Sequence, residues 1–333
     1  MDRKEEILKI FPKELRQILS QIQAEFSEIQ EIRLRAGQPL MMVCKGREYL
    51  VGEKGQLLEP EREAAGVRSA YIISPLQLTQ TTEYMSSYSL YAAEDEIRQG
   101  FFTIRGGHRI GLAGRAVAEG QEIRRIKFIS FLNVRVAHEV IGCADGVMGE
   151  LYGREEGRVS FLNTLLISPP RMGKTTLLRD MIRQISRGEN GIPGMTVGVV
   201  DERSELGACY QGVPQNDLGP RTDVMDCCPK AQGMMMLVRS MSPQVVAVDE
   251  IGSGQDAQAL DYVRNCGCAI AATAHGFSLE DIQGRKDLGR LVADGCFNRF
   301  LVLARGKRGE RAVRILDGKG QLIRIVSERG AIC

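Results

Sequence analysis

Residues 164–180 read TLLISPPRMGKTTLLRD, and this stretch decides the fold of the second half of the chain. It starts with a short apolar run, passes through a turn-forming segment that contains Gly173, and continues with apolar residues at helical spacing. A strand, a glycine–lysine–threonine loop and a helix in this order form the context in which such a loop binds phosphate. The stretch therefore predicts an anion site at the end of a buried strand.

The predicted phosphate loop is expected to hold ATP. Backbone N–H groups of the loop and of the helix N-terminus face the β-phosphate, Lys174 neutralises the β- and γ-oxygens, and the Thr175 hydroxyl ligates Mg²⁺. Ser168 stands where the consensus G-x-x-x-x-G-K-[ST] begins with glycine, and two prolines follow it, so the loop conformation stays open. The predicted nucleotide-binding residues are Ser168, Pro169, Pro170, Arg171, Met172, Gly173, Lys174, Thr175 and Thr176.

A second motif supplies the acids that hydrolysis requires. Residues 245–252 read VVAVDEIG, so that Asp249 and Glu250 follow an apolar run at the predicted end of a strand. We expect Asp249 to complete the magnesium shell with Thr175, and Glu250 to polarise the attacking water. Strands that end in two acids are common, and it is the combination with the phosphate loop that makes this motif specific.

Two further strand ends carry polar residues. Residues 199–207, VVDERSELG, place Glu202 and Glu205 near the predicted phosphate site as catalytic candidates, although the N-terminus of a helix would also be enriched in acids. Residues 271–276, AATAHG, place His275 after a strand of small residues. This histidine could sense the γ-phosphate, or local hydrogen bonds could simply satisfy it.

The remaining apolar runs set the fold class. After residue 160, short runs such as QVVAVDE and CAIAATAH alternate with helical periods, which is typical of a parallel sheet covered by helices. Before it, two short helices around Pro12, a helix that starts after Ser74 and a hairpin around Gly106 indicate a mixed domain. We therefore predict an α/β protein with a RecA-like P-loop NTPase core over 141–333 and a smaller α+β N-terminal domain over 1–140.

Composition disfavours several other classes. The 333 residues carry a net charge of +2, with 5% aromatic residues and no tryptophan, which argues against a surface that stacks nucleic-acid bases. The basic stretch ARGKRGERAVR at 304–314 keeps one alternative open, a RecA-like nucleic-acid-dependent ATPase or remodeller. A scaffold that binds ATP without hydrolysing it is a further alternative. Glu250 and the acidic residues at 201–205 argue against it, because a protein that only binds ATP does not need them.

Cysteine usage and the N-terminus indicate a compartment. Nine scattered cysteines without C-x-x-C spacing, in a chain that begins without a signal peptide, indicate reduced thiols in a cytoplasm. We interpret Cys227–Cys228 and the pair Cys266 and Cys268 as small hydrophobes rather than zinc ligands, and Met234–Met236 as packing between helix and sheet. No apolar stretch approaches the ~18 residues that span a bilayer.

The motifs together resemble the type II/IV secretion ATPases among the RecA-like motors. RSMSPQVVAVDEIG is similar to the Walker B region of that branch, DERSE to its acidic box and ATAHG to its histidine box. Over residues 100–280, the chain resembles more closely the stage III sporulation protein AA family of spore-forming Firmicutes, on the segments GGHRIGLAGRAV, FLNVRVAHEV, ISPPRMGKTTLLRD and RTDVMDCCPKAQGMMMLVRSMSPQVVAVDEIG.

This resemblance implies an ATPase that works as a homo-oligomer, expected to be a hexamer, in the mother-cell cytoplasm. It implies attachment at the membrane through a partner, stage III sporulation protein AB, and a role as motor of the channel complex between mother cell and forespore. Residue by residue, it implies that Lys174 and Thr175 belong to Walker A and that Asp249 and Glu250 belong to Walker B. It places Glu202 and Glu205 in the acidic box and His275 in the histidine box.

The resemblance also implies that the N-terminal domain contributes arginines to the nucleotide and takes part in assembly. Arg105, Arg109 and Arg115 flank the glycine turn and are the candidates. An arginine finger can accelerate phosphoryl transfer by ~10³–10⁵, so an isolated protomer should be slow. Alternatively, these arginines only solvate a hairpin. The sequence leaves open the ring size, the cargo, and whether Glu250 or the pair Glu202 and Glu205 activates water.

Overall fold

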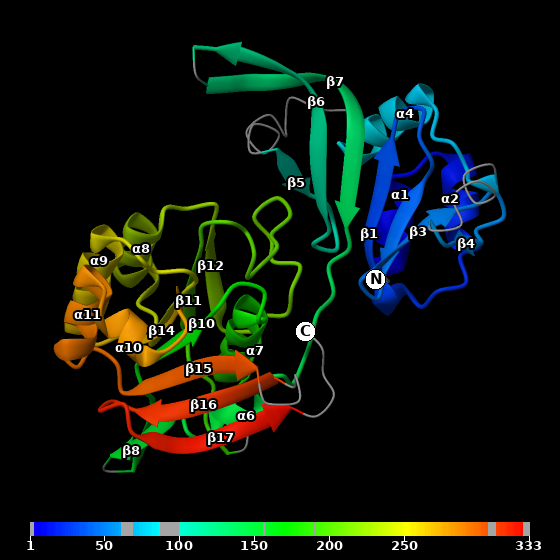
Figure 1. Ribbon diagram of the computed structural model, residues 1–333. Helices are drawn as coiled ribbons and strands as arrows, with labels where there is room; N and C mark the ends of the chain where they lie inside the picture. Colours follow the sequence, from blue (N-terminus) through cyan, green and yellow to red (C-terminus); the bar gives the residue numbers. More distant parts are fainter. Residues whose placement is uncertain are drawn as a thin grey trace. The chain divides into compact units, whose positions relative to one another are not determined.

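Two compact units make up the computed structural model, which describes residues 3–60, 69–86, 100–120, 122–155, 157–189, 191–305 and 311–328. The first unit spans Met1–His138 and the second Glu139–Cys333. Figure 1 shows the elements of both units.

The N-terminal unit is built on an antiparallel sheet with the strand order β4-β3-β2-β1-β7-β6-β5. Apolar residues alternate along its strands, so that Ile32 and Leu34 of β1 pair with the equally buried Val134 and Leu132 of β7. The strands are β1 (Ile29–Arg35), β2 (Met41–Cys44), β3 (Arg47–Val51), β4 (Leu57–Leu58), β5 (Phe101–Thr103), β6 (Arg109–Glu119) and β7 (Glu122–Arg135).

Short helices complete the core of this unit. They are α1 (Arg3–Lys9), α2 (Lys13–Ser20) and α4 (Pro75–Met85), with the 3-10 turn η1 (Phe26–Glu28). Leu15 of α2 and Leu78 of α4 belong to the same apolar cluster as the inner face of the sheet. Ser74 starts α4 with a capping box, because its hydroxyl accepts the Gln77 N–H at 3.2 Å and the Gln77 side chain accepts the Ser74 N–H at 3.1 Å.

The hairpin of β6 and β7 is longer than its neighbours. Strands β1 and β5 pair with its inner part, whereas its outer part, from Arg115↔Lys127 to Glu119↔Glu122, is a two-stranded ribbon. The register shifts between Ala113 and Arg115, and Phe128 adopts a positive φ of 49° nearby. Such bulges bend and twist a ribbon, as Figure 1 shows for this one.

The C-terminal unit contains an eight-stranded sheet with the order β12-β11-β13-β14-β10-β15-β16-β17. Strands β12 to β15 of this order run parallel, and β16 and β17 add antiparallel at one edge. They are β10 (Thr164–Ser168), β11 (Val197–Asp201), β12 (Thr222–Asp226), β13 (Val245–Val248), β14 (Ala269–His275), β15 (Arg299–Arg305), β16 (Arg311–Asp317) and β17 (Leu322–Glu328). A separate pair, β8 (Tyr152–Glu155) and β9 (Arg158–Phe161), precedes them.

Helices cover both faces of this sheet because its central strands are apolar on both sides. Leu177 and Ile182 of α7 pack with Leu166 and Val199 on one face, and Leu237 of α8 belongs to the cluster on the other. The helices are α6 (Asp145–Met148), α7 (Lys174–Arg187), α8 (Lys230–Met241), α9 (Gly254–Asn265), α10 (Leu279–Gln283) and α11 (Lys286–Ala293). Figure 1 shows α8, α9 and α11 grouped together, apart from α7.

A buried polar network fixes helix α7, which carries the predicted phosphate loop at its N-terminus. The carboxylate of Asp180 accepts the backbone N–H of Ala144 at 2.8 Å and the Nε–H of Arg183 at 2.7 Å. Arg183 also reaches Glu189 at 2.9 Å, so the buried charges are paired and hydrogen-bonded as burial requires. The network therefore ties the helix to the segment that leads into the unit.

Several sequence interpretations are wrong or fall outside the described residues. No helix follows β11, since residues 202–221 form turns, so the alternative that their acids mark a helix N-terminus is wrong. Met236 is exposed at 53%, and only Met234 of the methionine run is fully buried. The sequence also predicts a second helix after α4, ending at about Arg98. Its segment, the centre of the basic stretch (306–310) and Cys333 lie outside the described residues.

Burial differs among the cysteines that the structure describes. Cys268 and Cys296 are buried, whereas Cys227 and Cys266 are exposed, so the interpretation as buried hydrophobes holds for only some of them. Burial raises the pKa of the Cys296 thiol to about 11. Within the part of the chain that the structure describes, none of the helices has the length and apolarity that a membrane crossing demands.

Candidate functional site

The four predicted motifs lie together at the carboxyl ends of the parallel strands of the C-terminal sheet. Strand β14 lies between β10, which leads into the phosphate loop, and β13, which leads into Asp249 and Glu250. Ser168 of β10 is paired in register with His275 of β14, and β11 lies beyond β13. Because the strands are parallel, all these motifs follow the carboxyl ends of neighbouring strands, which is where ligands bind in open α/β sheets.

The backbone of the predicted phosphate loop is curled. Arg171 and Gly173 have positive φ values of 60° and 78°, with Met172 between them at negative φ. Alternating signs of φ turn successive N–H groups toward one point and create a concave anion site. Ser168, in place of the consensus glycine, is buried and its hydroxyl donates to the Pro169 carbonyl at 2.8 Å. The small serine is thereby accommodated beneath the loop.

Helix α7 begins directly after this loop with Lys174. Its N-cap residue is Gly173, which has no side chain with which to cap the first turn. Lys174 is 5% exposed, and its Nζ lies 3.2 Å from Glu250 Oε1 and 3.7 Å from Asp249 Oδ1. The ammonium group is therefore held at the end of the sheet by two carboxylates from the neighbouring motif.

Oxygen donors suited to a hard cation lie beside Lys174. The Thr175 hydroxyl donates to Asp249 Oδ2 at 2.6 Å, and the Thr273 hydroxyl donates to Asp249 Oδ1. Mg²⁺ in phosphate sites takes one or two protein oxygens and completes its shell with phosphate oxygens and water. A hydroxyl and a carboxylate in direct contact fit that requirement, so the donor set agrees with the predicted magnesium site. Among the described residues there is no cluster of three acids, histidines or cysteines that would hold a metal alone.

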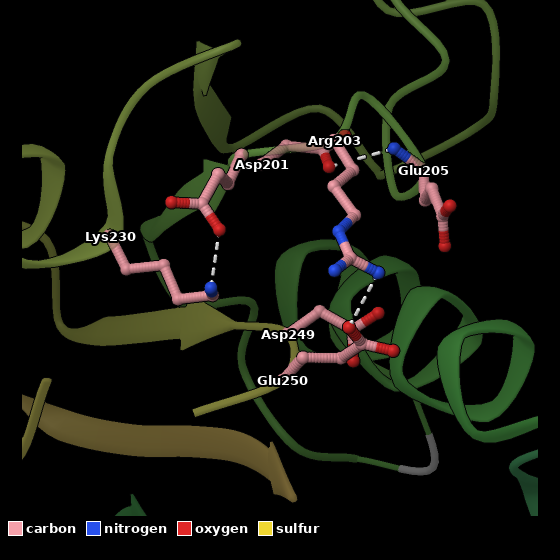
Figure 2. Close-up of a pocket in the computed structure, with 7 residues that line it drawn as sticks. Asp201, Arg203, Glu205, Lys230, Asp249 and Glu250 are labelled. Atoms are coloured by element: carbon pink, nitrogen blue, oxygen red, sulfur yellow. Dashed lines mark hydrogen bonds and ion pairs between the residues drawn. The ribbon is translucent and has the colours of Figure 1, made fainter. Parts of the chain in front are cut away.

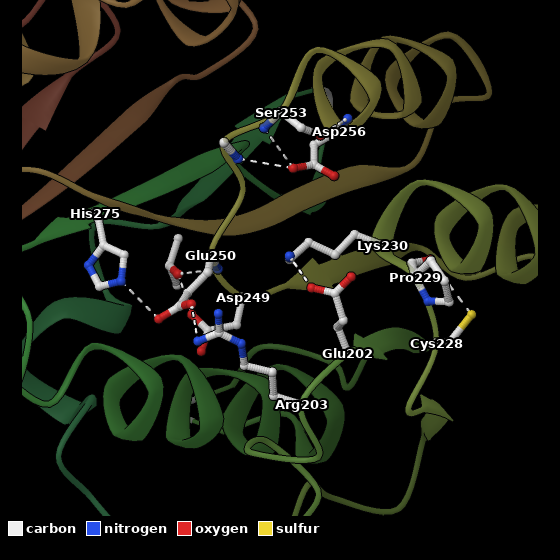
Figure 3. Close-up of polar contacts among 12 residues, drawn as sticks. Glu202, Arg203, Cys228, Pro229, Lys230, Asp249, Glu250, Ser253, Asp256 and His275 are labelled. Carbon is white, nitrogen blue, oxygen red and sulfur yellow. Dashed lines mark hydrogen bonds and ion pairs between the residues drawn. The ribbon is translucent and has the colours of Figure 1, made fainter. Parts of the chain in front are cut away.

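Glu250 contacts three basic side chains of the site. It adopts a positive φ of 57°, and its backbone N–H donates to Thr273 Oγ1 at 2.9 Å. His275 Nε2 lies 2.9 Å from Oε1 and Arg203 Nη1 lies 2.8 Å from Oε2, approaching from different sides as Figure 3 shows. A left-handed conformation at a non-glycine residue costs on the order of 1–3 kcal/mol and is concentrated at functional sites.

The cations around Glu250 also determine its protonation. Burial of the carboxyl group would raise its pKa, but the charge and hydrogen bond of Lys174, followed by Arg203 and His275, outweigh that effect. The pKa of Glu250 is therefore lowered from its ordinary value, and the side chain is a carboxylate in this state.

The acidic segment after β11 is organised by Asp201. Its buried carboxylate accepts the backbone N–H groups of Glu205, Leu206 and Gly207, each at 2.8 Å. Burial raises the pKa of Asp201 to about 6, against the opposing effect of these hydrogen bonds. Arg179 of α7 donates to the carbonyls of Glu205 at 2.7 Å and Leu206 at 3.0 Å, which attaches the segment to the phosphate-loop helix.

Glu202 and Glu205, the two glutamates expected here, line one pocket with Asp249 and Glu250. Figure 2 shows this pocket, with the guanidinium of Arg203 extending toward Asp249 and Glu250. Glu202 forms an ion pair with Lys230 at the start of α8. The structure therefore brings Asp249 and Glu250 together with the acidic segment, and it pairs Glu202 with a different cation from those that contact Glu250.

The three candidate arginines belong to the N-terminal unit. Arg105 is exposed beside the glycine turn, Arg109 begins β6 with its guanidinium 4.7 Å from the ring of Phe101, and Arg115 is exposed at the bulge of β6. Arg109 thus makes a cation–π contact within its own sheet, while Arg105 and Arg115 present their charges to solvent. Their role at a nucleotide remains a prediction.

Sequence reasoning missed Thr273, Arg203 and Lys230 in this site. Thr273 lies two residues before His275 on β14, and strand alternation could have placed both on the same side. Arg203 stands inside the acidic segment that was singled out for its glutamates. Lys230 had no local signal, because only the folded chain brings the start of α8 to Glu202.

Comparison with known sequences gives a clear result. Residues 1–323 match the model of the family described as "Sporulation stage III, protein AA". Stage III sporulation protein AA of Bacillus subtilis (strain 168) is 37% identical over 319 residues, which cover 96% of each chain.

Solved structures with a similar fold include a pilus retraction motor and an ATPase. The pilus retraction motor PilT with bound ADP superposes with a TM-score of 0.56 at 13% identity, covering 98% of this chain and 84% of that one. The ATPase DotB of Legionella pneumophila gives a TM-score of 0.53 at 15% identity, covering 88% and 78%. At such identity the likeness concerns the fold, and the predicted fold class is confirmed.

Proposed function

The chain belongs to the stage III sporulation protein AA family, and from this premise we propose that it is a magnesium-dependent ATPase that works as a ring-shaped oligomer. One observation carries the proposal. Lys174 and Thr175, at the start of the helix behind a curled loop, contact Glu250 and Asp249 directly. A cation suited to phosphate, a hydroxyl suited to a metal and two acids are thus in direct contact with one another.

In the proposed reaction the loop and Lys174 bind the triphosphate. Backbone N–H groups of residues 171–176 donate to the phosphates, and the ammonium of Lys174 exchanges its carboxylate partners for β- and γ-oxygens. Thr175 and Asp249 would hold Mg²⁺, which would neutralise negative charge on the phosphate oxygens when bound. The PilT structure, which has the same fold, contains ADP and supports a nucleotide as ligand.

Glu250 is the proposed base. Its carboxylate accepts a proton from water while the water oxygen forms a bond to the γ-phosphorus and the bond to the β–γ bridging oxygen breaks, which yields ADP and phosphate. A positioned general base contributes typically ~10²–10⁴-fold. His275 Nε2 lies 2.9 Å from Oε1 and orients the carboxylate. Because His275 is the last residue of β14, this contact couples the position of Glu250 to that strand. We assign Glu202 and Glu205 to the acidic box beside this centre.

Arginines of the N-terminal unit complete the proposed site in an oligomer. Arg105, Arg109 and Arg115 are the candidates for stabilising the charge that develops on the γ-phosphate, as the family resemblance implies. A protomer alone would then hydrolyse ATP slowly, and assembly would raise the rate by up to ~10³–10⁵.

The cellular role that we propose follows from the family. Turnover would drive the channel complex between mother cell and forespore, with the protein in the mother-cell cytoplasm and attached to the membrane through stage III sporulation protein AB. A hexamer is the proposed assembly. The similarity to a pilus retraction motor supports a mechanical output.

Phosphate release by the purified protein tests the activity. We expect turnover that requires Mg²⁺, rises more steeply than linearly with protein concentration, and disappears in Lys174→Ala. Lys319→Ala, which removes an exposed lysine from the turn between β16 and β17, is the control and should leave turnover unchanged. Turnover that survives Lys174→Ala would exclude this site, and stimulation by DNA or RNA would favour the alternative of a nucleic-acid motor.

A further inference from the structure

Two cations, Lys174 and Arg203, and the imidazole of His275 converge on the carboxylate of Glu250, and they do not share its oxygens equally. Lys174 at 3.2 Å and His275 at 2.9 Å both contact Oε1. Arg203 contacts Oε2 at 2.8 Å from the acidic segment, as Figure 3 shows. The arginine therefore holds the oxygen that the phosphate-loop lysine leaves available.

We propose that Arg203 is a further phosphate-binding residue, which exchanges Glu250 for the γ-phosphate when the triphosphate binds and thereby frees Glu250 to act on water. This inference rests on the proposed ATPase function. The carboxylate of Glu250 lies between Lys174 and Arg203 and contacts both. A phosphate group would take that place, since both residues are ordinary phosphate ligands in proteins.

Geometry puts Arg203 within reach of the phosphate that Lys174 would bind. Both cations contact the same carboxylate group, so an anion of similar size between them meets the ammonium on one side and the guanidinium on the other. A guanidinium presents parallel N–H groups that match two oxygens of a phosphate. The side chain of Arg203 is 65% exposed, so it can reorient without opening the core.

The other cation in the pocket is less suited to this exchange. Lys230 lines the same pocket, but its side chain is 16% exposed and it is paired with Glu202 rather than with Glu250. Arg203 is carried by a segment whose ends are fixed, because Asp201 binds the backbone N–H groups of Glu205, Leu206 and Gly207. The anchored loop holds the base of Arg203 in place while the guanidinium changes partner.

An exposed ion pair with no further role would contribute little to stability and would not distinguish between nucleotides. The proposal predicts discrimination instead. Arg203 would contact the γ-phosphate, which ATP has and ADP lacks, so its loss should weaken binding of the triphosphate selectively.

The experiment measures dissociation constants of the full-length protein for Mg–ADP and for the Mg complex of the non-hydrolysable β,γ-imido analogue of ATP. For Arg203→Ala we expect the affinity for the analogue to fall by roughly tenfold or more, as for loss of a charged hydrogen bond, with ADP affinity within about twofold. Turnover at saturating ATP should fall as well. Arg203→Lys should keep part of the affinity, and Arg290→Ala, which removes a half-exposed arginine paired with Asp261, should change neither constant.

Each other outcome overturns the inference in a recognisable way. An equal loss of affinity for both nucleotides would make Arg203 a structural residue, and unchanged constants would make it a surface ion pair. The inference alone fails if the parent protein binds both nucleotides, Lys174→Ala binds neither, and Arg203→Ala keeps the parent's ratio of the dissociation constants for the ATP analogue and for ADP. The proposed function would then stand. If the parent binds neither nucleotide, the proposed function fails and the inference fails with it.

Discussion

At the scale of single residues, the site consists of charges that compensate one another. Lys174 is almost fully buried yet contacts two carboxylates, and Asp249 receives hydroxyl hydrogens from Thr175 and Thr273. Removing one member of such a cluster leaves its partner buried without compensation, which is costly. Conservative substitutions that keep shape and remove only one chemical capacity are therefore the informative ones.

Glu250→Gln is the substitution that separates binding from hydrolysis. The amide keeps the size of the side chain but cannot take a proton from water, so turnover should fall by ~10²–10⁴ while Mg–ATP binding persists. Glu202→Gln, measured beside it at protein concentrations that favour assembly, should cost much less because Glu202 is paired with Lys230. A larger loss from Glu202→Gln than from Glu250→Gln would transfer the role of base to the acidic segment.

At the scale of elements, the strand ends could be predicted and the loops between them could not. Apolar runs that end in Ser168, Asp201, Val248 and His275 are readable because buried parallel strands require them. The conformation after β11 depends on Asp201 binding three N–H groups of its own loop, and a lone aspartate in the sequence carries no sign of that. Edge strand β17 was likewise missed, since its exposed apolar residues lack a clean alternation.

The raised pKa of Asp201 gives this segment a pH dependence. Because burial raises the pKa from 3.8 to about 6, the folded protein binds a proton that the unfolded chain has already lost between these values. The contribution of Asp201 to the free energy of unfolding is therefore largest at low pH. It is lost as pH rises through about 6, which lowers the free energy of unfolding by up to ~3 kcal/mol.

Urea unfolding of the parent and Asp201→Asn, followed from about pH 4 to pH 7, measures that contribution. The parent should lose stability relative to Asp201→Asn as pH increases, since the amide does not titrate. Asp223→Asn on the neighbouring strand β12 serves as the control and should follow the parent. Parallel curves for Asp201→Asn and the parent would show that Asp201 is ionised throughout.

At the scale of the whole molecule, the sequence anticipates an N-terminal α+β part and a P-loop core, and the chain divides into units at His138 and Glu139. The proposed contribution of one protomer to another could not be predicted from residue patterns, because contacts between chains leave no periodicity or spacing within a single chain. Arg105 and Arg115 are recognisable only as exposed cations near a glycine turn and a bulge.

Mixing variants tests whether the arginines act between protomers. We would examine three single variants, Arg105→Ala, Arg109→Ala and Arg115→Ala. The variant that removes the arginine finger should reduce turnover by ~10³ or more without loss of ATP binding. Mixed with Lys174→Ala protein, that variant should regain activity, because intact sites form where the two kinds of protomer meet. Failure of every mixture to regain activity would place the arginines outside a shared site.

The most direct test of the central claim is calorimetric titration of the purified protein with Mg–ATP, in parallel with Lys174→Ala. We predict binding with a dissociation constant below the millimolar range for the parent, a marked loss when EDTA removes the metal, and no detectable binding by the variant at equal folded content. Equal binding by both proteins, or no binding by the folded parent at millimolar Mg–ATP, would contradict the account.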